Sequence, residues 1–157
     1  MVNSTLCYIE KDGSYLMLYR NKKKIDANGG KWIGVGGKFL ENESPEDCVV
    51  RETLEETGLR LVSPKIRGIV TFVSDKYETE QMFLFTADRF EGTLNSVCDE
   101  GELRWIPKER IGTLNLWEGD RLFLKLLSED APFFLMKLEY CGDRLERASV
   151  DGVAIEI

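Results

Sequence analysis

The chain has 157 residues, the length of one domain of roughly 150 residues, and its 43% hydrophobic and 31% charged residues are typical of a soluble globular fold. Its 28 acidic and 21 basic residues leave a net charge of -7, which disfavours a surface that binds a nucleic-acid polymer. Because there is no histidine, histidine-based triads, imidazole acid–base catalysis and histidine-ligated zinc are excluded, and the chemistry must come from carboxylates, lysines, cysteines or a hard metal.

The first predicted elements are two strands at residues 5–9 and 15–19. The pair Asp12-Gly13 between these β-rich runs predicts a hairpin. A polar loop follows at residues 21–31, and residues 32–35 predict a short strand that a pair of glycines ends.

The clearest helix is predicted from Ser44 to residue 57. Ser44 suits the N-cap, Pro45 suits the first helical position, and Asp47 stands where the acid of a capping box belongs. Gly58 is the expected C-terminal glycine, so both ends of this helix have local signals.

The second half of the chain predicts strands, one further helix and no repeat or linker. Apolar residues at helical spacing indicate a helix within residues 119–129. We expect one mixed α/β domain over residues 1–157, with strands at 66–73, 82–90, 103–106, 133–140 and 144–157.

The cysteines and the N-terminus predict the compartment. The four cysteines are far apart and form no C-x-x-C pair, so we expect reduced, mostly buried thiols. Residues 1–5 show no signal peptide, and no stretch approaches the ~18 apolar residues that a membrane helix needs. We therefore expect a cytoplasmic protein without membrane segments.

The predicted helix at 44–57 concentrates negative charge. At about 100° per residue, Glu52, Glu55 and Glu56 share one face, while Val50 and Leu54 point the opposite way and are expected to pack on the protein. Glu52 and Glu56 are a like-charge (i, i+4) pair, and Glu55 and Glu56 lie in the last turn, beside the negative end of the helix dipole. Together these effects lower the stability of the helix by on the order of 1–2 kcal/mol. A cation would remove this cost, and carboxylate oxygens suit Mg²⁺ or Mn²⁺. The alternative is an ordinary solvated acidic face.

The spacing of the charged and glycine residues resembles the signature of the Nudix hydrolases, the MutT-like family. Every charged and glycine position of that signature is matched, and Thr53 stands where an aliphatic residue is usual. The resemblance implies an α/β/α sandwich with a mixed sheet. The matching positions are Gly37, Glu43, Arg51-Glu52, Glu55-Glu56 and Gly58-Leu59.

The resemblance also implies a reaction, the cleavage of a nucleoside diphosphate linked to another moiety with divalent metal and water. It places Glu52, Glu55, Glu56 and Gly37 at the metal, where Gly37 lets the loop turn tightly against the helix. Arg51 would orient the glutamates, and Glu43 would have a more structural role. The catalytic set becomes Arg51, Glu52, Glu55 and Glu100.

Glu100 comes from the acidic loop 99–102, because family members often take a further glutamate from a later loop. The alternative is an acidic surface turn. Without histidine a carboxylate is the natural base for the water, and whether that is Glu52 or a loop glutamate is open.

Substrate residues follow from a closer resemblance to the branch that sanitises oxidised purine nucleoside triphosphates such as 8-oxo-dGTP. Trp117 would stack on a purine, and Asp120 would accept hydrogen bonds from the edge of that purine. The alternative is that Trp117 is a packing residue and Asp120 a helix N-terminal acid. Relatives that recognise 8-oxopurines carry Asn at the position of Ile33, which cannot make those bonds. The remaining substrate contacts expected are Trp32, Lys23 and Lys38, although the lysine run at 22–24 also fits a solvated loop.

The predicted function is Mg²⁺-dependent hydrolysis of a (d)NTP, a purine or oxidised purine, to the monophosphate and pyrophosphate. The substrate is a small molecule, and the protein is expected to be a monomer or homodimer. The alternatives are a dinucleoside-polyphosphate or nucleotide-sugar hydrolase, in which Tyr77 would stack on a second base, and a sensing module without catalysis.

Overall fold

The computed structural model describes residues 1–22, 27–95 and 98–157, so Lys23 lies outside the described residues. Two helices, a short 3₁₀ helix and eleven strands form within these ranges. The helices are α1 (Pro45–Thr57), η1 (Lys108–Thr113) and α2 (Glu118–Ser128). The strands are β1 (Val2–Lys11), β2 (Ser14–Arg20), β3 (Trp32–Ile33), β4 (Arg60–Leu61), β5 (Lys65–Ser74), β6 (Glu80–Ala87), β7 (Phe90–Glu91), β8 (Gly101–Pro107), β9 (Phe134–Cys141), β10 (Arg144–Val150) and β11 (Val153–Ile155).

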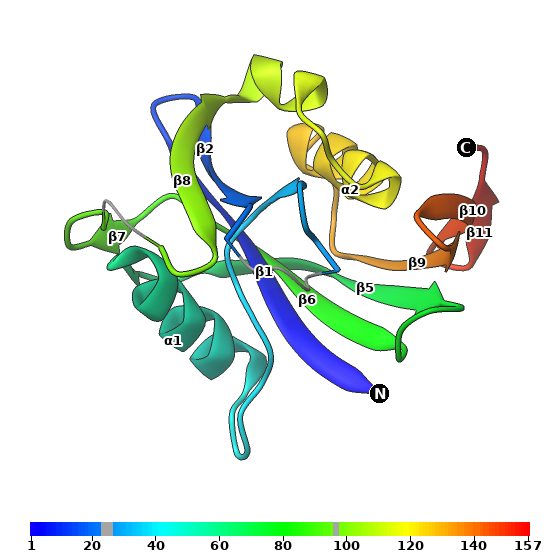
Figure 1. Cartoon of the computed structure of the whole chain (residues 1–157), viewed down its shortest axis with the longest axis horizontal. Coiled ribbons are helices and arrows are strands. Elements are labelled where there is room, and N and C mark those ends of the chain that lie inside the picture. Colours follow the sequence, from blue (N-terminus) through cyan, green and yellow to red (C-terminus); the bar gives the residue numbers. More distant parts are fainter. Residues whose placement is uncertain (23–26, 96–97) are drawn as a thin grey trace.

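The described strands build one nine-stranded mixed sheet and one small two-stranded sheet. The large sheet has the order β11-β10-β9-β5-β6-β1-β2-β3, and β8 adds to it by pairing with β2. β1 runs parallel to β6 and β5 runs parallel to β9, whereas the other pairs are antiparallel. The helices α1 and α2 lie on opposite sides of the central strands (Figure 1), so the predicted α/β/α sandwich is confirmed.

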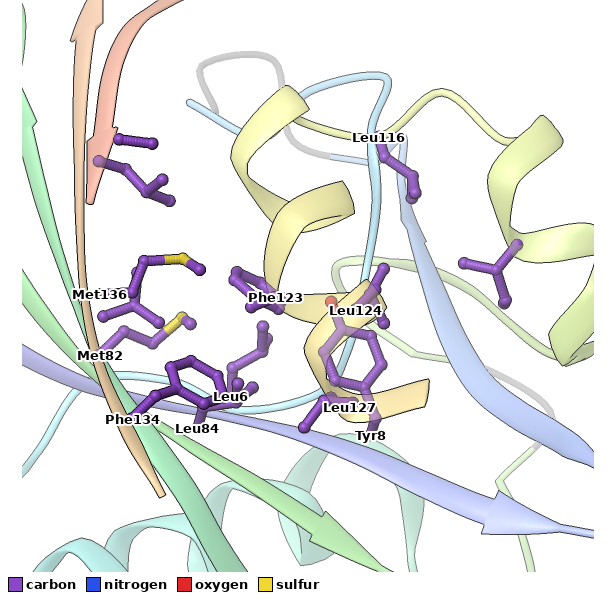
Figure 2. Close-up of a cluster of buried hydrophobic side chains, with 14 of the residues drawn as sticks. Leu6, Tyr8, Met82, Leu84, Leu116, Phe123, Leu124, Leu127, Phe134 and Met136 are labelled. Atoms are coloured by element: carbon purple, nitrogen blue, oxygen red, sulfur yellow. The ribbon is translucent and has the colours of Figure 1, made fainter. Parts of the chain in front are cut away.

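Strand β1 separates two hydrophobic cores because its side chains alternate between the faces of the sheet. Leu6 and Tyr8 pack in the core beneath α2, which also contains Phe123 (Figure 2). Cys7 and Ile9 pack in the second core with Val49 of α1. The two helices are therefore anchored on opposite faces of one strand.

Helix α1 begins and ends where its caps predict. The Ser44 hydroxyl accepts a hydrogen bond from Asp47 N at 3.0 Å, and the Asp47 carboxylate accepts one from Ser44 N at 3.0 Å. Gly58 has the left-handed conformation, with φ of 80°, and its N–H donates to Leu54 O. The capping-box and glycine predictions are confirmed.

The predicted packing face of α1 is wrong. Leu54 is 39% exposed and Val50 is half-buried. The buried residues are instead Cys48, Val49, Thr53, Glu56 and Thr57. The small and β-branched side chains lie against the sheet, and this rotation turns Glu56 inward. The carboxylate side of the helix therefore borders the body of the protein.

Several element boundaries also differ from the predictions. The strand expected over 82–90 ends at Ala87, and Phe90 pairs with Leu61 in the small sheet instead. The strand expected over 144–157 is a hairpin that turns at Asp151-Gly152, where φ is 50° and 81°. In the segment expected as a strand over 32–35, Val35 forms an isolated bridge with Cys7.

Two expectations about the whole chain can be compared with the structure. All four cysteines are free thiols, three of them buried, while Cys141 is exposed. Within the described ranges, no helix has the length and apolar character required to cross a membrane.

Candidate active site

The Arg51 guanidinium joins the loop that precedes α1 to the helix itself. Its Nε donates to Glu43 Oε2 at 2.6 Å and its Nη2 donates to Glu43 Oε1 at 2.9 Å, which is a two-pronged ion pair. Nη2 also donates to the backbone carbonyl of Lys38 at 3.1 Å. Glu43 thus holds the arginine, as the structural role implied by the resemblance requires.

The third nitrogen of the same side chain faces the acidic side of α1. Arg51 Nη1 donates to Glu52 Oε1 at 2.9 Å and to Glu55 Oε2 at 3.2 Å. The hydrogen bond with Glu43, above all, raises the pKa of Arg51, so its charge is permanent. Arg51 therefore fixes the direction of two of the three glutamates predicted at the metal.

Gly37 leaves the space that the Glu52 carboxylate occupies. A Cβ atom at this position would lie 2.5 Å from Glu52 Oε2, which no real contact permits. The Gly37 carbonyl oxygen already accepts hydrogen bonds from Thr5 N at 2.8 Å and from Cys48 Sγ at 3.5 Å. The missing side chain supports the spacing role of Gly37, and its place at the metal stays a prediction.

Glu56 is the buried acid of the helix, with 9% of its surface exposed. Burial, followed by the charge of Glu100, raises its pKa to about 8, and Glu52 adds to the shift. Its Oε2 accepts a hydrogen bond from Gly36 N at 3.4 Å. The pKa of Glu52 is also raised, first by burial and then by Glu55 and Glu100.

The carboxylates around Glu56 fit a hard divalent cation by their chemistry. Several acids share a partly buried space and raise one another's proton affinity, which is the state that a cation with oxygen ligands would relieve. Among the described residues, no three acidic or cysteine side chains are already gathered as a metal-binding group. Ligation would therefore need a change of side-chain rotamer, which is open to Glu55 because its side chain is 60% exposed.

Glu100 immediately precedes β8, and its charge raises the pKa of Glu52 and of Glu56. Its Oε2 accepts a hydrogen bond from Arg20 Nη1 at 2.8 Å, and its side chain is 23% exposed. The next residue, Gly101, packs so tightly on the Tyr19 carbonyl that no side chain would fit there. This close strand contact fixes the backbone beside Glu100, and the role of Glu100 in the catalytic set stays a prediction.

Trp117 is the N-cap residue of α2 and is half-buried. Its Nε1 donates to Asn28 Oδ1 at 2.9 Å, and the Tyr140 ring meets it edge-on at 5.5 Å between centroids. The Lys31 ammonium lies 4.9 Å from the ring centroid. Sequence reasoning missed Asn28, Lys31 and Tyr140, because their proximity to Trp117 depends on contacts between distant segments.

Asp120 lies in the first turn of α2, yet it is only 4% exposed. Burial raises its pKa to about 7, against the opposing effects of Lys31 and Arg121. Its side chain accepts no hydrogen bond from the described part of the chain. Asp120 is thus a buried helix N-terminal acid, and its contact with a purine edge stays a prediction.

The other predicted substrate contacts, Trp32, Lys38 and Lys23, do not share one environment. Trp32 is half-buried, its ring centroid lies 5.0 Å from that of Tyr19, and its backbone N–H donates to the Asn115 carbonyl. Lys38 is exposed, beside the carbonyl that binds Arg51. Lys23 is not described. The structure therefore brings the glutamates and Arg51 together on α1, and Trp117 with Asp120 on α2.

Comparison with known proteins finds relatives over most of the chain. The family model described as NUDIX domain matches residues 2–127. An uncharacterized Nudix hydrolase of Bacillus subtilis is 34% identical over 120 residues, 74% of this chain and 72% of that protein. The oxidized purine nucleoside triphosphate hydrolase of Mus musculus is 32% identical over 121 residues, 76% of this chain and 72% of that protein. The crystal structure of the Mutator MutT protein from Bacillus halodurans has a TM-score of 0.87 at 26% identity and covers 96% of this chain and 98% of that one.

Proposed function

Because the chain belongs to the Nudix hydrolase family, we propose that it hydrolyses purine nucleoside triphosphates to the monophosphate and pyrophosphate with Mg²⁺. The observation that carries this proposal is the link from Glu43 through Arg51 to Glu52 and Glu55, beside the buried Glu56. In that arrangement Arg51 fixes the direction of Glu52 and Glu55, which supports a metal site on this face of α1.

Nudix hydrolases generally use a divalent metal, and here Glu52, Glu55 and Glu56 would hold it. A bound Mg²⁺ or Mn²⁺ supplies charge neutralisation of the pyrophosphate and a more acidic bound water. The chain itself orients the carboxylates through Arg51 and excludes solvent from Glu56. The raised pKa of Glu56 makes it able to hold a proton near neutral pH while the site has no cation.

The general base is assigned among the carboxylates. Glu100 is held by Arg20 and its charge acts on Glu52 and Glu56, which supports it as the group that takes a proton from a water at the helix. Glu52, bound to Arg51, is the other candidate. A carboxylate is the natural choice of base because the chain has no histidine.

The purine is assigned to the region of Trp117 and Asp120. An indole ring that is fixed by Asn28 and Tyr140 offers a rigid stacking surface, and the buried Asp120 offers an acceptor without a partner in the described chain. The mouse relative is named for oxidized purine nucleoside triphosphates. The Ile33 side chain cannot hydrogen-bond a base, so it gives no preference for an oxidised purine. We therefore propose the purine class as a whole, with an oxidised purine as one candidate within it.

The test is a turnover panel with Mg²⁺ across the four dNTPs, 8-oxo-dGTP, ADP-ribose and diadenosine polyphosphates, with products identified by chromatography. We expect a purine triphosphate to give its monophosphate and pyrophosphate in the highest yield, and we expect chelation of the metal to stop the reaction. A chain that cleaves ADP-ribose or a dinucleoside polyphosphate but no triphosphate would contradict the substrate class and leave the family unaffected.

A further inference from the structure

Asn28 and Gly29 form a pair of residues with a covalent chemistry of its own. Asn28 is the only asparagine in the sequence that is followed directly by a glycine. The backbone nitrogen of a following residue can attack the carbonyl carbon of an asparagine side chain. Glycine permits this attack most readily, because it has no Cβ atom to shield its nitrogen or to restrict the backbone.

The pair opens a tight turn at the surface. The Asn28 carbonyl accepts a hydrogen bond from Lys31 N at 2.9 Å, and Gly30 has a φ of 78°, as in a type II turn. Gly29 is exposed, and within the described part of the chain its N–H donates no hydrogen bond. The nitrogen that must lose its proton is therefore not protected by a backbone partner.

The Asn28 side chain is bound to an indole ring. Its Oδ1 accepts a hydrogen bond from Trp117 Nε1 at 2.9 Å. Negative charge develops on Oδ1 when Gly29 N attacks the Asn28 Cγ, and an N–H group that is aimed at such an oxygen stabilises the charge. The indole bond therefore assists the attack, whereas the turn bond from Lys31 must open as the backbone rotates.

We propose that Asn28-Gly29 is a modification site at which the folded chain deamidates, and that the new carboxylate acts on Trp117. Gly29 N forms a bond to Cγ and closes a succinimide ring, while the side-chain nitrogen leaves as ammonia with the proton of Gly29 N. Water then opens the ring. Addition at the side-chain carbonyl gives aspartate, and addition at the backbone carbonyl gives isoaspartate. The only co-reactant is water, and the inference does not depend on the proposed hydrolysis.

The two products act differently on the indole ring. Aspartate keeps an oxygen at the place of Oδ1, and a charged acceptor binds Trp117 Nε1 more strongly than a neutral amide does. It also adds a negative charge near Lys31, whose ammonium lies 4.9 Å from the Trp117 ring centroid. Isoaspartate lengthens the backbone by one carbon, which shifts the turn bond from Lys31 and moves the carboxylate relative to the indole.

The test is an ageing experiment on the full chain, followed by peptide mapping with mass spectrometry. A deamidated peptide has the mass of an amide replaced by a carboxyl group, and chromatography separates isoaspartate from aspartate. Gly29→Ala is the matched variant, because Gly29 has no positive φ and alanine therefore fits its backbone. Asn115 is the internal control, since its Nδ2 donates to the Gly30 carbonyl at 2.8 Å but a leucine follows it.

We expect folded wild type to lose the Asn28 amide, and faster at alkaline than at neutral pH, because the Gly29 nitrogen reacts without its proton. The folded rate should lie within about tenfold of the rate in urea, the factor that corresponds to opening one turn hydrogen bond. Over the same time Gly29→Ala should keep its Asn28 amide, and every chain should keep the Asn115 amide.

The effect on Trp117 is measured by NMR of the indole N–H groups. The Trp117 signal is assigned by its absence from Trp117→Phe. In Asn28→Asp, which represents the aspartate product, this signal should move downfield because the hydrogen bond becomes charge-assisted. The isoaspartate fraction of aged wild type should unfold at a lower Tm than Asn28→Asp, since its turn is distorted.

Two results overturn the inference. One is a folded chain that keeps the Asn28 amide while the chain in urea loses it, which would mean that the turn and the indole hold Cγ away from Gly29 N. The other is a Trp117 N–H signal that is the same in wild type, in Asn28→Asp and in the isoaspartate fraction. Mass, Tm and the indole signal are independent of turnover, so a failure of the proposed hydrolysis would leave this test intact.

Discussion

At the scale of single residues, Glu56 combines deep burial with a raised pKa, and this makes it the sharpest test of the metal assignment. Replacing Glu56 with Gln keeps the shape of the protonated acid, so we expect the free energy of unfolding to be unchanged or slightly higher. The same change removes an anionic oxygen, and kcat should fall about 100-fold or more. Activity assays with Mg²⁺ and urea unfolding measure both effects.

Glu46→Gln is the matched control, because Glu46 lies on the same helix, in its first turn, and is exposed. Its turnover should stay at the wild-type level. Glu56→Gln with wild-type kcat would remove Glu56 from the metal site.

Asp120 gives a pH-dependent prediction at the same scale. Its folded pKa is raised from 3.8 to about 7, so the native state retains a proton that the unfolded chain releases above pH 4. Stability from this group is therefore full below about pH 4 and is lost as the pH rises to about 7. Asp120→Asn should thus gain stability relative to wild type on going from pH 5.5 to 8.5, on the order of 2 kcal/mol.

Urea unfolding at the two pH values measures this difference. Glu118→Gln, an exposed acid of the same helical turn, should show no such pH-dependent gain. A constant difference between Asp120→Asn and wild type at both pH values would mean that Asp120 titrates as an ordinary surface acid.

Which residues could be predicted depended on whether their signal is local. Glu52, Glu55 and Glu56 follow from helical spacing within one segment, and Arg51 from the signature around them. Asn28 meets Trp117 across 89 positions of the chain, and Tyr140 meets the Gly119 N–H from β9. No spacing rule connects such positions, since sheet pairing and helix packing bring them together.

At the scale of elements, the contact between the glycine loop and α1 can be tested by steric change alone. A methyl group at Gly37 would collide with the Glu52 carboxylate. Gly37 does not have a positive φ, so alanine fits its backbone conformation. Gly37→Ala should therefore displace Glu52, lower kcat by about tenfold or more, and have a modest effect on Tm.

Gly112→Ala in η1 is the control, since a Cβ atom there would meet nothing within 4 Å and this glycine also lacks a positive φ. Its kcat and Tm should match wild type. Full activity in Gly37→Ala would show that the position of Glu52 is not set by this loop.

The ends of α1 were predictable from the sequence, whereas its orientation was not. Caps are made by residues next to the helix, so Ser44, Asp47 and Gly58 carry the information locally. The packing face was assigned by assuming that apolar side chains point inward, which left Leu54 inside and Glu56 outside. The helix instead packs its small and β-branched side chains on the sheet, which buries Thr53 and turns Glu56 inward.

At the scale of the whole molecule, the fold class was predictable, but the order of the strands was not. Alternating runs and turn residues indicate strands, and one signature indicates the family. The parallel pairing of β5 with β9 joins segments more than 60 positions apart, which local patterns do not encode. That pairing brings the C-terminal strands, outside the residues 2–127 that match the family, into the main sheet.

The C-terminal strands therefore make a prediction about the whole fold. β10 contributes Leu145 and Ala148 to the core beneath α2, whereas Val153 of β11 is 67% exposed. Deleting residues 153–157 should cost about 1 kcal/mol, since it removes one half-buried side chain, Ile155, from the core edge.

Deleting residues 142–157 should cost several kcal/mol, because it removes Leu145, Ala148 and the strand that pairs with β9. A loss of that size is a large part of the about 5–15 kcal/mol that stabilises a domain, so this chain should unfold well below the wild-type Tm or fail to fold. Thermal unfolding of the two truncated chains measures the difference. The difference in Tm between the two truncated chains measures what β10 adds to the core beneath α2. Equal Tm values for the two chains would mean that the stabilising core lies entirely within the residues that match the family.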